Sequence, residues 1–254
     1  MNPRNIARLV YRNIMVNTDP ASLVILIVLP AMYLIFFGYG FQSLIAPTGG
    51  ESYLRFLSPG IMSFQTLIAG TFGGSMLWAD RRFGMLTQLL VGPFTRLEYL
   101  LGLIITALIF GLVGAFLMLF VAFALLQSLS VTAVGASLMI GSITVGSILF
   151  GSIMLLISAY VESNTTYNSI QVLLLFFVNF ASPVFYPYSS NLPVAIRVLF
   201  FVNPLTYIAN MVRDGFLSTV GGADALQFAT LTILTGLLLA LSKRAYDVSL
   251  KSLS

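Results

Sequence analysis

The charged residues of this chain are confined to a few short segments, separated by long stretches without Asp, Glu, Lys or Arg. Such stretches include residues 20–50, 56–79 and 99–161. Only 8% of the residues are charged and 58% are hydrophobic, whereas soluble domains carry about 25% charged residues. A charged side chain at the centre of a hydrocarbon core costs roughly 2.5–3.5 kcal/mol. The uncharged stretches therefore fit inside a bilayer, and the pattern predicts an all-α integral membrane protein built as one domain, 1–254.

Six apolar segments are long enough to cross a bilayer as helices. About 20 residues suffice, because the hydrocarbon core is ~30 Å thick and a helix rises about 1.5 Å per residue. Asp19-Pro20 provides a helix cap and a first helical residue for the first span, and Pro30 predicts a kink within it. The predicted transmembrane helices are 21–44, 57–79, 98–126, 134–160, 167–186 and 225–241.

The basic residues are distributed unequally between the two ends of these spans. An even number of spans places both termini on one side. Loops on the cytoplasmic side of a membrane carry an excess of Lys and Arg. We therefore expect a multi-pass protein of the cell (cytoplasmic or inner) membrane with both termini cytoplasmic, and Arg55, Arg197 and Arg213 outside. The cytoplasmic set is Arg4, Arg8, Arg12, Arg81, Arg82, Arg96, Lys243, Arg244 and Lys251.

The N-terminal segment 1–18 has the pattern of an amphipathic helix. Asn2-Pro3 reads as a cap followed by a first helical proline. Arg4, Arg8 and Arg12 then recur every four residues and share one helix face. The pattern favours a helix lying in the headgroup layer. The alternative is a solvated basic tail that only orients the first span.

A charged segment between the second and third spans is built as more than a connector. Residues 80–92 predict a short amphipathic helix that ends at Gly92-Pro93. Thr95 and Glu98 then match a capping box that starts the third span. Such a helix could fill a groove on a partner with its apolar residues and fix the register with its charges, or it could lie on lipid headgroups. The candidate docking residues are Asp80, Arg81, Arg82, Phe83, Gly84, Met85, Leu86, Leu89 and Leu90.

The segment 191–219 holds two apolar pieces, each too short to span a membrane. Asn203-Pro204 divides them as cap and first helical residue. We predict two short helices dipping into the outer leaflet between the fifth and sixth spans, with an ordinary external loop as the alternative. Aromatic residues near the outer end of the fifth span are candidates for an exit pathway or for an interfacial belt. They include Phe176, Phe180 and Tyr186.

The chain lacks the residues that several kinds of chemistry require. There is no Cys and no His, which excludes thiolate nucleophiles, histidine bases and Cys/His zinc sites. No ionisable residue lies in the middle of a predicted span, which argues against ion-coupled transport. No phosphate-binding G-x-x-x-x-G-K-[ST] motif is present. We expect no catalytic residue, metal or cofactor here, and read the net charge of +4 as an orientation signal rather than as nucleic-acid binding.

Three segments in order resemble the permease subunit of ATP-binding-cassette exporters of the type-2 (ABC-2) family, which includes drug, multidrug, lipid and polysaccharide exporters. The first is F-L-S-P-G-I-M-S-F-Q, and the second is W-A-D-R-R-F-G-M-L-T-Q-L-L-V-G-P-F-T-R-L-E-Y-L-L-G. The third is F-Y-P…L-P…N-P-L-T-Y…R-D-G. The second departs from the family pattern at Arg82-Phe83 and Gly84-Met85, where a Glu and a Thr are frequent.

The resemblance implies a function and partners. The segment around residues 80–90 would dock on a cytosolic ATPase subunit that binds ATP and Mg²⁺, and a second copy or a related permease would complete the transporter. An amphipathic drug, lipid or lipid-linked glycan would move outward. The alternatives from the spans alone are a passive channel and a membrane scaffold. The outer short helices would bear on substrate exit, and their candidate gate residues are Pro187, Asn203, Pro204, Tyr207 and Arg213.

Overall fold

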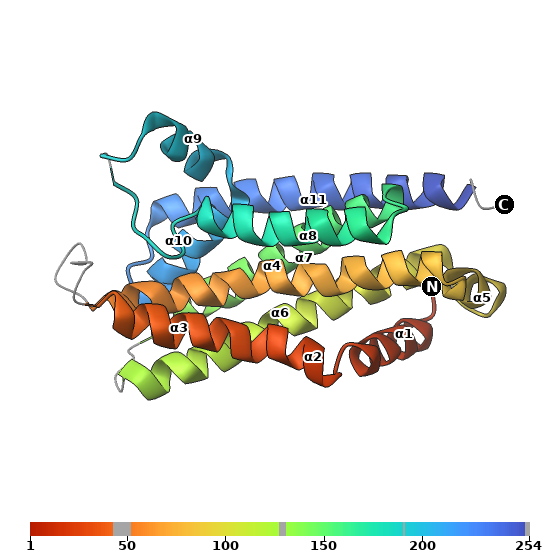
Figure 1. Cartoon of the computed structure of the whole chain (residues 1–254), viewed down its shortest axis with the longest axis horizontal. Helices are drawn as coiled ribbons and strands as arrows, with labels where there is room; N and C mark the ends of the chain where they lie inside the picture. Colours follow the sequence, from red (N-terminus) through yellow and green to blue (C-terminus); the bar gives the residue numbers. More distant parts are fainter. Residues whose placement is uncertain (43–51, 127–130, 190, 252–254) are drawn as a thin grey trace.

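A computed structural model describes residues 1–42, 52–126, 131–189 and 191–251, and these form helices joined by short connections. Most of the helices run along the long axis of one bundle (Figure 1). No strand occurs in the described ranges. The helices are α1 Pro3–Val16, α2 Pro20–Leu23, the π-helix η1 Val24–Val28, α3 Leu29–Gly40, α4 Tyr53–Arg82, α5 Met85–Val91, α6 Arg96–Leu126, α7 Ala133–Tyr160, α8 Asn164–Phe180, α9 Val194–Val202, α10 Pro204–Leu217 and α11 Gly222–Lys251.

Both termini lie at the same end of the bundle, together with α5 (Figure 1). We call this the terminal end, defined by α1, α5 and the last turns of α11. The loop that carries α9 lies at the opposite end. The N-terminal helix begins as its cap predicts, because the side chain of Asn2 accepts a hydrogen bond from the backbone N–H of Arg4, and Pro3 follows.

Within the described ranges, four helical segments are long and apolar enough to cross a membrane: Pro20–Gly40, Arg96–Leu126, Ala133–Tyr160 and Gly222–Ser249. They overlap four of the six predicted spans, although residues 43 and 44 of the first lie outside the described ranges. The pair α9 and α10, bent by 77°, would make a fifth if it counts as one broken span. The chain is therefore a multi-pass membrane protein.

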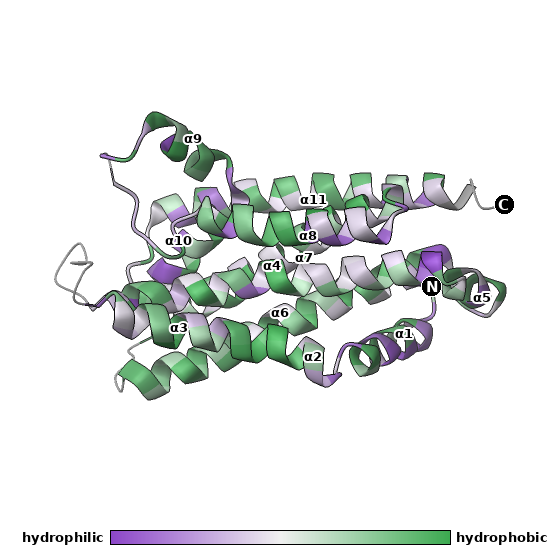
Figure 2. Cartoon of the chain, in the orientation of Figure 1, coloured by the Kyte–Doolittle hydropathy of each residue, from purple (hydrophilic) through white to green (hydrophobic). Residues whose placement is uncertain are grey.

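The predicted spans 57–79 and 167–186 correspond to helices that are less apolar or shorter than these four. α4 is long, but its sequence is less apolar, and Figure 2 shows it in mixed pale colours. It is also the most enclosed helix, packed against α3, α6, α7 and α10. Because protein surrounds it, its polar residues need not meet lipid. α8 ends at Phe180, and residues 181–186 form a turn, so the predicted helix to 186 is too long by six residues.

Small residues let α4 and α7 approach closely. A Cβ atom added at Gly70 would lie 2.6 Å from the backbone carbon of Phe150, and one at Gly74 would lie 2.6 Å from the Cβ of Met154. Such contacts exclude any larger side chain. Close backbone approach is the usual basis of helix association in lipid, so these glycines hold α4 in the centre of the bundle.

Pro30 shapes the first span through a missing hydrogen bond rather than a sharp kink. Proline has no backbone N–H, so the carbonyl of Leu26, four residues earlier, loses its helical donor. The chain widens there into the π-helix η1. The side-chain amide of Gln65 in α4 donates to the Leu26 carbonyl oxygen at 3.0 Å. A neighbouring helix thus satisfies the freed carbonyl, as burial in a membrane requires.

Candidate functional site

The charged segment after the second predicted span is a helix end, a turn and a second helix. α4 continues through Asp80, Arg81 and Arg82, so the prediction of one helix over 80–92 is wrong at its start. The chain turns at Gly84, whose φ is +73°, and α5 begins at Met85. Residues other than glycine pay roughly 1–2 kcal/mol in this left-handed conformation. A helix that ends with such a glycine makes a sharp, defined corner between α4 and α5.

Asp80 faces the interior of the molecule and not its rim. Its two carboxylate oxygens accept from the Arg12 guanidinium, Nη1 to Oδ2 at 2.8 Å and Nη2 to Oδ1 at 2.5 Å. The hydroxyl of Tyr99 in α6 also donates to Oδ2, at 2.7 Å. The expectation that Asp80 meets a partner is therefore corrected, because its side chain is buried and both carboxylate oxygens already accept hydrogen bonds from the same chain. Three helices, α1, α4 and α6, are tied together at this carboxylate.

Arg12 also differs from the two other arginines of its helix. Burial lowers the pKa of the Arg12 guanidinium, but the hydrogen bonds and charge of Asp80 outweigh this and raise it above its ordinary value. Arg12 therefore stays charged. Arg4 and Arg8 are exposed. The three arginines predicted to share one face thus divide into one that forms an internal ion pair and two that are exposed.

The N-terminal helix α1 is fixed at its start by a second acidic residue. Glu98 and Thr95 form the predicted capping box: Glu98 N–H donates to Thr95 Oγ1 at 3.2 Å, and Thr95 N–H donates to Glu98 Oε2 at 3.0 Å. Glu98 Oε1 also accepts from the backbone N–H of Asn2 at 2.6 Å, and Oε2 from the Asn5 amide at 3.3 Å. The sequence analysis missed this link. Its signal is the set of Asn5, Leu9 and Asn13, which recur every four residues and form the buried face of α1.

The helix α5 turns its apolar face back onto the bundle. Leu86 is 1% exposed and packs in a cluster with Leu9, Tyr99 and Leu100. Leu89 and Leu90 are half-buried against the same cluster. The expectation that Leu86 fills a groove on a partner is therefore wrong, because neighbouring helices of the same chain already cover it. The docking role of the half-buried Leu89 and Leu90 stays a prediction.

The outward side of the corner is exposed and carries apolar residues beside the polar Thr87 and Gln88. Phe83 is 77% exposed, Met85 40% and Val91 85%. Large apolar side chains left exposed at a helix end can contact a partner or lipid. Of the predicted docking residues, the structure thus leaves Arg82, Phe83 and Met85 available, and it adds Val91, which the sequence analysis did not single out.

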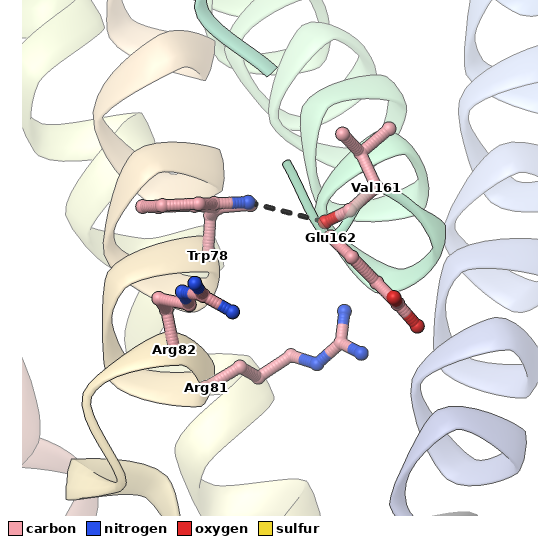
Figure 3. Close-up of a pocket in the computed structure, with 5 residues that line it drawn as sticks. All are labelled: Trp78, Arg81, Arg82, Val161 and Glu162. Atoms are coloured by element: carbon pink, nitrogen blue, oxygen red, sulfur yellow. Dashed lines mark hydrogen bonds between the residues drawn. The ribbon is translucent and has the colours of Figure 1, made fainter. Parts of the chain in front are cut away.

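Arg81 and Arg82 lie beside a cavity of about 200 Å³ at the terminal end (Figure 3). Arg81 reaches from α4 to the end of α7, where its Nη1 donates to the Ser158 carbonyl oxygen. The indole N–H of Trp78 donates to the Val161 carbonyl oxygen at 3.1 Å. Burial lowers the pKa of Arg81, although the charge of Glu162 partly offsets this.

At the opposite end, the side chain of Asn203 joins α8 to α10. Its Oδ1 accepts from the backbone N–H of Leu205 and caps α10, which begins at Pro204. Its amide nitrogen donates to the carbonyl oxygens of Val178 at 2.6 Å and Ala181 at 2.7 Å. The predicted cap therefore also serves as a bridge between two segments.

The other predicted gate residues lie around the same joint. Arg213 donates to the Pro183 carbonyl oxygen at 2.8 Å, and its guanidinium carbon lies 4.0 Å above the ring of Phe56. Tyr207 donates to the Phe201 carbonyl oxygen at 2.6 Å. Pro187 is half-buried. These contacts show how the residues are held, and their role in a gate stays a prediction.

The predicted pathway residues of α8 face outward from the bundle. Phe176 and Phe180 are stacked, with ring centroids 6.2 Å apart, and both are exposed. Tyr186 is half-buried, and its hydroxyl donates to the Phe180 carbonyl oxygen. The two phenylalanines are thus open to lipid or to another protein chain.

Residues 5–217 match the family described as ABC-2 type transporter. The chain belongs to the ABC-2 transporter family. The match begins in α1, includes the α4–α5 corner and the joint at Asn203, and ends with α10. No curated protein sequence matches the chain.

Membership identifies the molecule as the membrane domain of a transport system. An ABC-2 permease is a transport subunit that associates with ATP-binding subunits. In such a subunit the terminal end of this bundle, with its turn, ion pair and exposed apolar corner, is the candidate site of coupling.

Proposed function

We propose that this chain is the permease subunit of an ABC-2 exporter that moves an amphipathic drug, lipid or lipid-linked glycan outward. ATP and Mg²⁺ would be bound by a separate cytosolic subunit. The family match and the apolar helices support this proposal. The topology that fits best has six spans, formed by α2–η1–α3, α4, α6, α7, α8 and α11, with the terminal end in the cytoplasm. The excess of basic residues at that end supports this orientation.

The α4–α5 corner carries the proposal. Its inner side is held by Leu86 in the core and by the Arg12–Asp80–Tyr99 contacts. Its outer side presents Val91 and Phe83 to solvent. A docking element needs both properties. The exposed side chains contact the partner, and the internal contacts make α5 move together with α4, so a displacement by the partner passes to α4.

The helix behind the corner has the length needed to carry a movement across the membrane. α4 has 30 residues, which corresponds to about 45 Å at 1.5 Å per residue. Its opposite end contacts the turn after α8, where the hydroxyl of Tyr53 donates to the Phe185 carbonyl oxygen at 2.6 Å. A movement imposed at α5 would thus reach the joint formed by Pro187, Asn203, Pro204, Tyr207 and Arg213, which we propose to be the outer gate.

A second permease copy, or a related chain, would complete the pathway. α8 has an exposed apolar side that includes Leu173, Phe176 and Phe177. We propose that this side faces the second permease and that Phe176, Phe180 and Tyr186 line the exit. The stacked, exposed rings of Phe176 and Phe180 provide a surface for such a contact.

A matched pair of substitutions tests the docking assignment. Val91→Asp places a charge on the exposed corner, whereas Val248→Asp places the same charge on exposed α11 at the same end. The permease is purified together with its ATP-binding subunit, and association and substrate-stimulated hydrolysis are measured. Val91→Asp should abolish both, and Val248→Asp should leave both near wild type.

Three results would contradict the proposal. Unchanged association of the Val91→Asp protein with the ATPase would show that the corner is not part of the docking surface. Flux through the permease alone in liposomes, without ATP, would indicate a passive channel. Absence of any flux with a tightly bound, inactive partner would indicate a scaffold.

A further inference from the structure

The cavity beside the end of α4 holds cationic groups whose hydrogen-bond donors the fold uses only in part. Five residues line it: Trp78, Arg81, Arg82, Val161 and Glu162 (Figure 3). Its volume is about 200 Å³, below the ~300–1,000 Å³ of pockets that take drug-sized molecules. The cavity therefore suits a small group and not the transported substrate.

Its hydrogen-bond donors outnumber the acceptors that the structure supplies. Arg81 uses Nη1 on the Ser158 carbonyl, while its buried Nε has no acceptor among the described residues. Arg82 is exposed and makes no hydrogen bond or ion pair within the described part of the chain. Figure 3 shows Arg81 extending across the cavity toward the α7–α8 connection and Arg82 folded back toward Trp78. Two guanidinium groups thus border one small space.

The charges around this space select the sign of the occupant. Two arginines and Glu162 give the cavity a net charge of about +1, which complements a group with one negative charge. Guanidinium groups match phosphate oxygens in geometry as well as in charge. A phosphodiester carries one negative charge and several acceptor oxygens, and it fits the unused donors.

The surroundings of the cavity resemble a membrane interface. Trp78 stacks on Tyr167 with ring centroids 5.6 Å apart, and Tyr160 nearby in the sequence is exposed. Tryptophan and tyrosine concentrate at the level of lipid headgroups. α8 starts beside the cavity at Asn164 and carries an exposed apolar side that includes Leu173. A lipid with its phosphate in the cavity would have its acyl chains at the start of this helix, beside the face that we propose for the second permease.

We propose that this cavity binds the phosphodiester of an anionic membrane phospholipid, with Arg82 and Arg81 as donors and Glu162 limiting the affinity. The site adjoins the exposed corner, because Phe83 packs edge-on against Trp78, but lipid binding to the permease does not require the ATPase. Basic pockets between membrane helices are known to take anionic headgroups. The bound lipid would join the end of α4 to the α7–α8 connection.

In the test, purified full-length protein in detergent is titrated with phosphatidylglycerol, phosphatidylcholine or inorganic phosphate. Thermal unfolding gives the Tm, and native mass spectrometry detects the bound lipid. Phosphatidylglycerol should bind and raise the Tm, and the other two should not. Arg82→Gln should weaken phosphatidylglycerol binding roughly tenfold, as expected for one lost charge-assisted hydrogen bond. Glu162→Gln should tighten it severalfold, because a like charge is removed. A role of Glu162 in folding alone would not tighten binding.

Arg8→Gln is the matched control, since Arg8 is an exposed arginine of the terminal end that does not line the cavity. Its affinity should stay near wild type. Equal binding of both lipids, or an unchanged affinity in Arg82→Gln, would overturn the proposal. Equal stabilisation by inorganic phosphate would indicate that the cavity binds a free anion and not a lipid. If Arg82→Gln weakened ATPase association but left phosphatidylglycerol binding intact, the cavity would belong to the docking surface.

Discussion

The ion pair between Arg12 and Asp80 predicts an asymmetry between its two partners. The Asp80 side chain is 7% exposed and that of Arg12 26%. Arg12→Gln leaves a buried carboxylate with the Tyr99 hydroxyl and without its cation, and we expect a loss of about 2–3 kcal/mol, since removal of one partner from a fully buried pair costs about 3–5 kcal/mol. Asp80→Asn leaves a guanidinium that can turn toward water, so its cost should be nearer ~1 kcal/mol.

The double variant makes the reasoning sharper. In Arg12→Gln/Asp80→Asn no charge is left buried, so this protein should be more stable than Arg12→Gln alone by about 1 kcal/mol. The assay is chemical or thermal unfolding of the four proteins in one detergent. Additive losses, or a larger loss for Asp80→Asn than for Arg12→Gln, would refute the view that the buried carboxylate dominates the energetics of this pair.

Two backbone features give further predictions. Gln65→Leu should destabilise the protein by about 1–2 kcal/mol because it leaves the buried Leu26 carbonyl without a donor. Adding Pro30→Ala should restore a backbone donor and recover part of the loss in unfolding experiments, whereas equal loss in the single and double variants would contradict this origin. Gly84→Ala should cost about 1–2 kcal/mol because of its positive φ, and it should lower ATPase association. Gly40→Ala, at a position where an added Cβ meets nothing within 4 Å, should be neutral or stabilising, and equal effects of both substitutions would argue against strain at the corner.

Helix starts could be predicted from the sequence because a cap depends on residues only two or three positions apart. Asn2, Asp19 and Asn203 each cap a helix whose first residue is proline, and Thr95 and Glu98 form their box. In each case the donor and the acceptor lie in one short segment. Local chemistry was therefore sufficient for these four helix starts.

The interaction partners of the charged side chains could not be predicted in the same way. Arg12 and Asp80 are 68 positions apart in the chain, and no local pattern joins them. The amphipathic spacing of Leu86, Leu89 and Leu90 correctly indicated an apolar helix face, but spacing does not tell whether that face meets the same chain or another one. The exposed residue Val91 was missed for the same reason, because it lies outside the apolar repeat.

The central position of α4 explains both why its sequence is less apolar than that of the neighbouring spans and a mechanical property. Its Ser58, Ser63, Gln65 and Thr66 are fully buried, and they reduce its hydropathy below that of a lipid-facing span. Yet the small and polar residues allow the close contacts that fix α4 against α7 and η1. A helix held this tightly moves together with its neighbours. We therefore expect relative motion at the boundary with α8, whose outward side is exposed, and spin-label distances from α4 to α7 should change less during ATP turnover than those from α4 to α8.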